Sequence, residues 1–187
     1  MNTKNEIRKE IKNIRKNMSK TEVETKSQLI TQKLINILKK TNNQIYFIYN
    51  SYNNEVKTTE IIDYLLTNKK NVYLPKISEE DMSTIPYTTS TKLEQNFYNI
   101  LEPIGKEADI NNFICVMPLV AADLKGHRIG QGKGYYDKYL KNKNCLKIGI
   151  CYDYQIIEEI PYEEHDITLD IIISEKRTIK LNKKSRN

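Results

Sequence analysis

The sequence predicts a single three-layer α/β domain over residues 1–187, with a mainly parallel central sheet flanked by helices. Short apolar runs typical of buried strands alternate with amphipathic runs typical of helices, and this alternation favours a parallel sheet covered by helices on both faces. A length of 187 residues is enough for one well-buried core. Because no internal repeat or interdomain linker interrupts the chain, we expect one domain, ending in a frayed basic tail over residues 176–187.

Two capping boxes predict where the first two helices begin. Thr3 and Glu6 form a T-x-x-E box, and Ser19 and Glu22 form an S-x-x-E box. Apolar residues then recur at helical spacing. They are Ile7, Ile11, Ile14 and Met18 after the first box, and Val23, Leu29, Ile30, Leu34, Ile37 and Leu38 after the second. We therefore expect two amphipathic helices before the first strand.

The other elements are predicted from apolar runs and their flanks. Strands are expected over residues 44–49, 72–75, 113–117, 146–150 and 170–174, and helices over residues 58–66 and 135–141. Pro75 is expected to close the second strand, and residues 78–111 offer only short strand-like pieces around residues 85–87 and 99–101. Ligands gather at the carboxyl ends of parallel strands. The segments expected there are residues 50–55, 118–137 and 151–153.

Composition limits the classes of protein and partner. The formal net charge of +6 allows a polyanionic partner such as nucleic acid, but small anionic substrates explain it equally well, because lysines and acidic residues are mixed along most of the chain. Cys115, Cys145 and Cys151 lack C-x-x-C spacing, which argues against a disulfide framework or a zinc site and favours a reducing cytoplasm. We expect no membrane span and no signal peptide, because no apolar run is long enough and the N-terminal segment is polar.

The most informative stretch is Gly126-His-Arg-Ile-Gly-Gln-Gly-Lys-Gly-Tyr-Tyr-Asp137, which holds four of the six glycines in the sequence. Glycine lets backbone N–H groups approach an anion closely. Arg128 and Lys133 place positive charge among those amides, and Asp137 is a hard oxygen ligand suited to Mg²⁺. A loop that gathers donors, cations and a carboxylate before an expected helix predicts a phosphate site.

This loop does not fit either of the two standard phosphate motifs. A Walker A loop needs four residues between its glycines and a serine or threonine after its lysine, whereas five residues separate Gly126 from Gly132 and Gly134 follows Lys133. A dinucleotide fingerprint needs G-x-G-x-x-G, whereas Gly130, Gly132 and Gly134 give G-x-G-x-G. The glycines alone are also compatible with a tight hairpin that binds no ligand.

Charged residues of the first helix form a second candidate group. Lys4, Arg8 and Arg15 lie along one edge of its apolar stripe. Such charges usually form a solvated flank, and spacing alone favours that interpretation. The alternative is that Lys4 and Arg8, one turn apart, reach a ligand at the start of the helix.

The histidines and the first cysteine are weaker candidates. His127 and His165 lack metal-ligand spacing with the cysteines, so we interpret both as structural, although His165 beside Asp166 could orient a site. Cys115 is interpreted as a core residue, because it lies within an apolar strand.

The run Met117-Pro-Leu-Val-Ala-Ala-Asp123, followed by the Gly126–Asp137 stretch, closely resembles the signature of the 5-formyltetrahydrofolate cyclo-ligases, also called 5,10-methenyltetrahydrofolate synthetases. The R-x-G-x-G-x-G-Y-Y-D pattern is highly specific to that family. Weaker matches cover nearly the whole chain: Lys4 and Arg8 as K-x-x-x-R, residues 50–55, Leu74-Pro75 and Glu164-His-Asp166. The resemblance implies Mg²⁺-dependent cyclisation of 5-formyltetrahydrofolate to 5,10-methenyltetrahydrofolate, with ATP converted to ADP and phosphate through an imidoyl phosphate.

The resemblance also implies a role for each site residue. ATP contacts are implied for Lys4, Arg8, Arg128, Ile129, Gly130, Gln131, Gly132, Lys133, Gly134, Tyr135 and Tyr136, with Arg128, Lys133 and Tyr135 as the catalytic set. Folate contacts are implied for Asn50, Glu55, Gln131, Gly132, Lys133, Gly134 and Tyr135, and magnesium-linked carboxylates for Asp137 and Asp166. A carboxylate such as Glu55 suits the adjacent N–H donors of a pterin.

Several of these residues also have simpler interpretations. Glu55 precedes an expected helix and Asp137 lies in the first turn of another, where an acidic side chain favours the positive end of the helix dipole. Asp166 can be read as an ordinary loop carboxylate. Tyr135 and Tyr136 could pack on a flat ring, but aromatic residues near a helix start are more often part of the core.

The chain departs from the family after Pro118, where members commonly carry a glycine and an aromatic residue and this sequence has Leu119-Val-Ala-Ala122. That departure leaves the shape of the pocket wall open. Two other functions also stay open: a nucleotide-binding relative that acts on another acceptor, and a basic nucleic-acid-binding module. With the cyclo-ligase function we expect a cytoplasmic monomer that uses small-molecule substrates and has no membrane partner.

Overall fold

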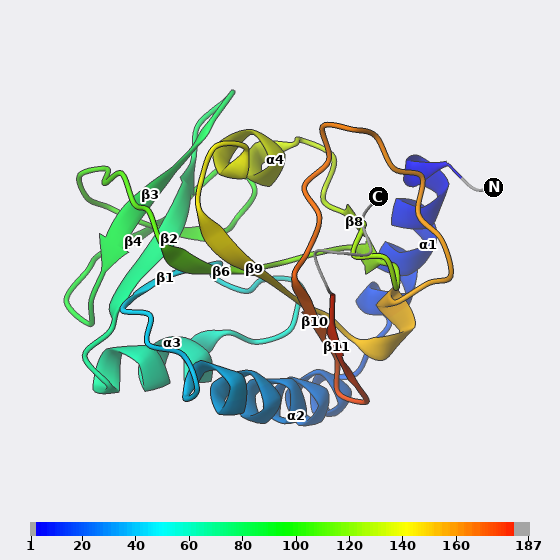
Figure 1. The fold of residues 1–187 in the computed structure, drawn as a ribbon, viewed down its shortest axis with the longest axis horizontal. Coiled ribbons are helices and arrows are strands. Elements are labelled where there is room, and N and C mark those ends of the chain that lie inside the picture. Colours follow the sequence, from blue (N-terminus) through cyan, green and yellow to red (C-terminus); the bar gives the residue numbers. More distant parts are fainter. Residues whose placement is uncertain (1–2, 182–187) are drawn as a thin grey trace.

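The computed structural model describes residues 3–181. A seven-stranded sheet crosses it in the order β11-β10-β9-β6-β1-β2-β3 (Figure 1). The strands are β1 (Ile45–Ile48), β2 (Asn71–Ile77), β3 (Met82–Tyr87), β6 (Phe113–Met117), β9 (Cys145–Ile150), β10 (Ile171–Ile173) and β11 (Thr178–Lys180). The five inner strands are parallel, and both edge strands run antiparallel to their neighbours. The predicted α/β class with a mainly parallel sheet is therefore confirmed.

Both predicted capping boxes are formed. α1 (Lys4–Lys16) begins after Thr3, and α2 (Lys20–Leu38) begins after Ser19, each with the reciprocal hydrogen bonds that satisfy first-turn N–H groups. α3 (Thr59–Thr67) and α4 (Tyr135–Leu140) lie where the sequence predicts them. Within residues 3–181, no helix has the length and apolar character needed to cross a membrane.

Each face of the sheet has its own hydrophobic core. One cluster joins α2 and α3, below the sheet in Figure 1, to Ile48 of β1 and Val116 of β6. The other cluster joins α4, above the sheet in Figure 1, to Phe47 of β1 and Cys115 of β6. Successive side chains of a strand point to opposite faces. Ile48 and Val116 therefore face α2 and α3, and Phe47 and Cys115 face α4 on the other side of the sheet.

α1 packs beside these layers, against a two-stranded ribbon formed by β7 (Ala121–Ala122) and β8 (Arg128–Ile129). Ile7 and Ile11 of the helix form a small buried cluster with Ala121 and Ile129 of the ribbon. A second ribbon pairs β4 (Leu93–Gln95) with β5 (Leu101–Pro103). Because the first ribbon leads directly into the glycine-rich loop, its contact with α1 fixes the helix beside that loop.

The expected end of the second strand is wrong. β2 continues past Pro75 to Ile77 and pairs with β3, and Pro75 lies opposite Thr84. β1 accompanies β2 only as far as Tyr73. Beyond that residue one side of β2 has no strand partner in the described part of the chain, so a residue without an N–H group is tolerated there.

Two further expectations about ends and pieces need correction. A frayed tail is wrong for residues 178–180, which form β11 by pairing with β10; residues 182–187 lie outside the described part of the chain. The strand-like piece expected at residues 85–87 is too short, because it is only the end of β3. The piece expected at residues 99–101 is displaced, because only Leu101 lies in β5.

Candidate active site

A pocket with a volume of about 680 Å³ lies at the carboxyl ends of β1 and β6. β1 continues through α3 to β2 on one side of it, and β6 continues through α4 to β9 on the other. The two connections leave the sheet in opposite directions. Such a switch point is where open α/β sheets bind their ligands.

All the predicted site residues line this pocket. They are Lys4, Arg8, Asn50, Glu55, Arg128, Ile129, Gly130, Gln131, Gly132, Lys133, Gly134, Tyr135, Tyr136, Asp137 and Asp166. One predicted segment does not contribute: Cys151 and Tyr152 are buried, and Asp153 forms an ion pair with Arg177. The structure therefore brings together residues from α1, the end of β1, the glycine-rich loop and residues 163–166.

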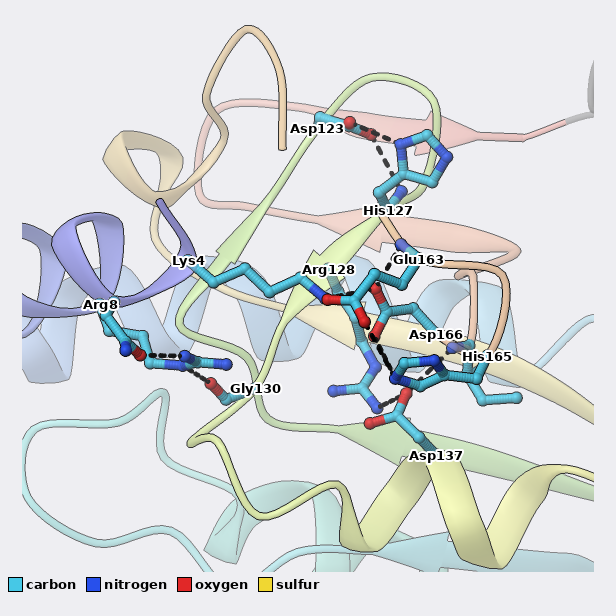
Figure 2. A network of polar contacts seen from close by, with 12 residues as sticks. Lys4, Arg8, Asp123, His127, Arg128, Gly130, Asp137, Glu163, His165 and Asp166 are labelled. Atoms are coloured by element: carbon cyan, nitrogen blue, oxygen red, sulfur yellow. Dashed lines mark hydrogen bonds and ion pairs between the residues drawn. The ribbon is translucent and has the colours of Figure 1, made fainter. Parts of the chain in front are cut away.

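The glycine-rich loop packs closely against α1. Gly132 has a φ of +105° and Gly134 a φ of +69°, and side chains disfavour positive φ. Arg8 Nε donates a hydrogen bond of 2.9 Å to the Gly130 carbonyl (Figure 2). A Cβ atom added at Gly132 would lie 3.5 Å from the Arg8 guanidinium carbon. The Arg8 guanidinium therefore lies directly on the loop backbone, and a solvated flank is the wrong description of this residue.

Lys4 joins α1 to residues 163–166. Its Nζ lies 2.6 Å from Asp166 Oδ2 and 2.9 Å from Glu163 Oε1 (Figure 2). Burial alone would lower the pKa of the Lys4 ammonium, but the hydrogen bonds to Asp166 and Glu163 outweigh it and raise that pKa. Burial alone would raise the pKa of the Asp166 carboxyl, but the Lys4 contact outweighs it and lowers that pKa. Both groups are therefore held in their charged forms.

Arg128 and Asp137 form a second short pair. Arg128 Nη2 lies 2.8 Å from Asp137 Oδ1, and the Ile167 N–H donates to the same oxygen at 2.9 Å (Figure 2). Arg128 is only 5% exposed, and among the described residues its Nε has no hydrogen-bond partner. A buried guanidinium with donors to spare can contact an anion in the pocket.

Lys133 differs from the other cations of the site. Its side chain is exposed at the loop, and within residues 3–181 no carboxylate lies within ion-pair distance of it. It therefore offers the pocket a positive charge that no carboxylate of the described residues neutralises.

The acidic residues of this region fit a magnesium ion that arrives with phosphates. Among residues 3–181, no group of three or more His, Cys, Asp or Glu side chains could hold a metal by itself. Mg²⁺ usually needs only one or two carboxylates, because waters and substrate phosphates complete its coordination. Asp137 and Asp166 both line the pocket, and each commits one oxygen, Oδ1 and Oδ2 respectively, to its protein cation. Within residues 3–181, the second oxygen of Asp137 has no ion-pair or hydrogen-bond partner, and that of Asp166 has only the exposed His165 Nε2 at 3.9 Å, which is beyond hydrogen-bond distance.

Glu55 occupies the other end of the pocket. It is 5% exposed, and it accepts long hydrogen bonds from the Tyr52 N–H at 3.3 Å and from Gln131 Nε2 at 3.4 Å. Arg15 Nη1 lies 3.6 Å from its Oε1. Burial raises the pKa of the Glu55 carboxyl to about 7, against the opposing effect of Arg15. Glu55 is therefore a buried carboxylate with weak protein partners rather than a residue that caps α3.

The two tyrosines and Asn50 differ in their surroundings. The Tyr136 ring stacks on Phe47 at a centroid distance of 5.8 Å, so it extends the core while it lines the pocket. Tyr135 lies nearer the surface, with its hydroxyl 3.3 Å from the Ser78 carbonyl. Asn50 Nδ2 donates to the Leu101 carbonyl at 3.1 Å, which links the end of β1 to the β4–β5 ribbon.

The two histidines have different environments. His127 pairs with the buried Asp123 at 2.8 Å (Figure 2). Its ring also stacks on Tyr162 at a centroid distance of 4.3 Å, so its structural interpretation is confirmed. The side chain of His165 is 69% exposed and lines the pocket beside Asp166, which contradicts a structural interpretation. Cys115 is fully buried in the core, as expected.

Sequence reasoning missed two cations near the pocket. Lys12 lines it one turn beyond Arg8, and Arg15 lies behind Glu55. The spacing of Lys4, Arg8 and Lys12 by four residues could have revealed the first. Arg15 was described as part of a solvated flank, which is wrong because it is only 7% exposed.

The departure from the family pattern after Pro118 affects only a small part of the pocket wall. Pro118 and Leu119 line the pocket, whereas Val120, Ala121 and Ala122 are fully buried and do not. The consequence of the substitution is therefore confined to the side chain at position 119 and its packing.

Comparisons with known proteins agree with this geometry. A model of the 5-formyltetrahydrofolate cyclo-ligase family matches residues 1–175. A 5-formyltetrahydrofolate cyclo-ligase from Haemophilus influenzae is 33% identical over 186 residues, which cover 92% of this chain and 100% of the relative. The solved 5,10-methenyltetrahydrofolate synthetase of Aquifex aeolicus aligns with a TM-score of 0.83 and 30% identity over 96% of this chain and 93% of its own. That of Mycoplasma pneumoniae aligns with a TM-score of 0.75 and 29% identity over 92% and 98%. The chain belongs to the 5-formyltetrahydrofolate cyclo-ligase family.

Proposed function

We propose that this chain catalyses the ATP- and Mg²⁺-dependent cyclisation of 5-formyltetrahydrofolate to 5,10-methenyltetrahydrofolate, as a cytoplasmic monomer. One observation carries the proposal: a single loop joins the two ends of the pocket. Gly130 accepts a hydrogen bond from Arg8 at one end, and Gln131 donates to Glu55 at the other. Groups suited to phosphates and a group suited to a pterin therefore lie side by side, as a phosphoryl transfer between them requires.

In this proposal the phosphates of ATP occupy the end of the pocket near the start of α1. The contacting residues are Lys4, Arg8 and the loop residues Arg128, Ile129, Gly130, Gln131, Gly132, Lys133, Gly134, Tyr135 and Tyr136. Among the residues that the structure describes, Lys133 has no competing carboxylate, and the buried Arg128 has an unused donor. Both are suited to neutralise charge that builds up during transfer. Tyr135 borders both substrates and completes the catalytic set.

The reduced folate occupies the end near Glu55. An ionised carboxylate accepts the adjacent N–H groups of an aminopyrimidine ring, and the long contacts of Glu55 leave it free to do so. Asn50 and the loop residues from Gln131 to Tyr135 form the rest of this contact surface. The apolar part of the lining, which includes Ile77, Met82 and Leu101, suits the flat body of the ligand.

The proposed reaction has two steps. The formyl oxygen of the folate attacks the γ-phosphorus of ATP, the bond from that phosphorus to ADP breaks, and an imidoyl phosphate forms. The neighbouring folate nitrogen then attacks the formyl carbon, loses its proton, and phosphate leaves with its bonding electrons. No protein nucleophile is required, so the contribution of the chain is to position both substrates and neutralise phosphate charge.

The chemistry that magnesium would supply here is positive charge, which would offset the negative charge of the transferred phosphate. Asp137 and Asp166 are the residues proposed to hold the ion. Their present partners, Arg128 and Lys4, hold the two carboxylates in place at the pocket.

The direct test is a turnover assay. Purified protein, ATP, Mg²⁺ and 5-formyltetrahydrofolate should produce the near-ultraviolet absorbance of the methenyl product, with phosphate released in equal amount. Folded Lys133→Met protein serves as the matched negative control. Phosphate release with other heterocycles but not with this folate would support a relative that acts on another acceptor. Salt-sensitive RNA or DNA binding without turnover would support a nucleic-acid-binding module.

A further inference from the structure

Arg15 occupies a position on α1 where an apolar residue is expected. The buried residues of the helix are Ile7, Ile11 and Arg15, spaced by four. Ile14, which the periodicity predicts on the core face, is instead 41% exposed. Burying a guanidinium is unfavourable unless a partner compensates for the lost water. The position of Arg15 therefore indicates a specific partner in the interior.

That partner is Glu55. Arg15 Nη1 lies 3.6 Å from Glu55 Oε1, and the side chains are 8% and 5% exposed. The groups whose charge or hydrogen bonding acts on Glu55 are Lys12 and Arg15 of α1, Tyr49 directly after β1, Tyr52, Gln131 of the loop, Tyr136 of α4 and Tyr152. Only the two residues of α1 are cations, and Arg15 is the buried one. It is the main source of positive charge for this carboxylate.

The backbone of Arg15 also contacts the turn that carries Glu55. Asn54, the neighbour of Glu55, donates from Nδ2 to the Arg15 carbonyl at 3.1 Å and to the Met18 carbonyl at 3.2 Å. Asn54 has a φ of +57°, and the Glu55 N–H closes the turn on the Tyr52 carbonyl at 3.0 Å. The end of α1 thus fixes both the charge and the backbone of the segment that carries Glu55.

The distance between the two side chains also matters. At 3.6 Å the guanidinium is within ion-pair range but makes no hydrogen bond to the carboxylate. Its charge favours the ionised form without occupying the oxygens. A closer, bidentate pair would use the same oxygens that a ligand needs.

We propose that Arg15 is a positioning residue of the site: from behind, its charge favours the ionised form of Glu55 and its contacts hold that carboxylate at the pocket, so that Glu55 can accept the N–H donors of the folate ring. This inference rests on the proposed function, in which Glu55 contacts the folate. Arg15 does not line the pocket itself. It acts on the substrate only through Glu55.

The test is a double-mutant cycle read out by calorimetric binding of 5-formyltetrahydrofolate and by separate KM values for the two substrates. Arg15→Met should weaken folate binding about 10- to 100-fold, the range typical for residues that orient a contacting group. It should leave the KM for ATP unchanged and shift the acidic limb of folate affinity upward by about one pH unit. In a Glu55→Gln background the same substitution should have little further effect. Arg15→Lys should restore part of the affinity.

Lys16→Met is the matched control, because Lys16 is an exposed cation on the same helix. Thermal unfolding of each variant checks that the fold is kept. Equal losses for both substrates, or an Arg15→Met effect as large in the Glu55→Gln background as in the wild type, would overturn the inference. Folate binding without turnover would refute the proposed reaction, yet the binding cycle would still decide on Arg15. A wild-type protein that binds no folate would overturn both.

Discussion

The two ends of the pocket handle charge in opposite ways. Near the start of α1, charged groups of the protein are already paired at short range, with Lys4 2.6 Å from Asp166 and Arg128 2.8 Å from Asp137. At the other end Glu55 is as deeply buried as Arg128, yet its partners lie at 3.3 to 3.6 Å. Lys4 and Arg128 are therefore compensated before any ligand arrives, whereas Glu55 is compensated only weakly.

This difference indicates what each end can bind. Short pairs hold cations and carboxylates in place, and an incoming phosphate with its metal can share them without a large rearrangement. An under-compensated buried carboxylate instead favours a ligand that brings hydrogen-bond donors of its own. The predictions below separate the two ends, beginning with the largest expected effect.

Lys133→Met removes the one cation of the loop that has no carboxylate partner within the described residues. We expect kcat/KM to fall about 100- to 1000-fold, as for loss of a donor that stabilises transition-state charge. The melting temperature should stay unchanged, because the side chain is exposed. Lys125→Met, at the exposed turn between β7 and β8, is the control for loss of one positive charge. A loss below about threefold in the Lys133 variant would mean that this end works by paired charges alone.

The pH dependence of stability tests the Glu55 end. Burial raises the pKa of Glu55 from 4.5 to about 7, so the folded protein holds this proton at pH values where the unfolded chain has lost it. Stability from this group is therefore present at low pH and is lost as pH rises between those two values, by up to about 3 kcal/mol. Denaturant unfolding across that range should show this fall in the wild type and a much smaller one in Glu55→Gln. Equal slopes would mean that Glu55 is not under-compensated.

Lys4→Met breaks the shortest pair of the α1 end and leaves Asp166 without its main cation. We expect the KM for ATP to rise about 10- to 100-fold, while folate affinity stays within about twofold because Glu55 is not touched. Steady-state kinetics with each substrate varied in turn gives both numbers. Lys9→Met, an exposed cation on the same helix, is the matched control. A comparable loss for both substrates would show that the two ends are not independent.

Features set by local sequence were predictable, and features set by a distant partner were not. The capping boxes at Thr3 and Ser19 are formed because each depends on four neighbouring residues. β11 was missed because residues 178–180 become a strand only by pairing with β10. The end predicted at Pro75 was wrong for a similar reason. A proline can lie within β2 only because the pairing of β1 with β2 ends at Tyr73, which local sequence does not indicate.

The same distinction holds within the site. The glycine-rich loop and its carboxylate are contiguous in sequence, so their composition already predicted a phosphate site. Arg15 and Glu55 are 40 positions apart in the chain, and an arginine among apolar positions looks like a solvated flank until its partner is known. Family resemblance supplied Glu55, but nothing in the pattern pointed to the cation behind it.

The smallest expected effect concerns the contact between the loop and α1. Gly132→Ala forces a side chain onto a φ of +105°, outside the left-handed well, with its Cβ 3.5 Å from the Arg8 guanidinium carbon. The strain of about 1 to 3 kcal/mol should raise the KM for ATP about tenfold by moving the loop away from Arg8. Gly134→Ala is the matched comparison, because its φ of +69° lies in that well and an added Cβ meets nothing within 4 Å. A larger loss in Gly134→Ala than in Gly132→Ala would mean that loop conformation at the start of α4, rather than contact with α1, sets nucleotide affinity.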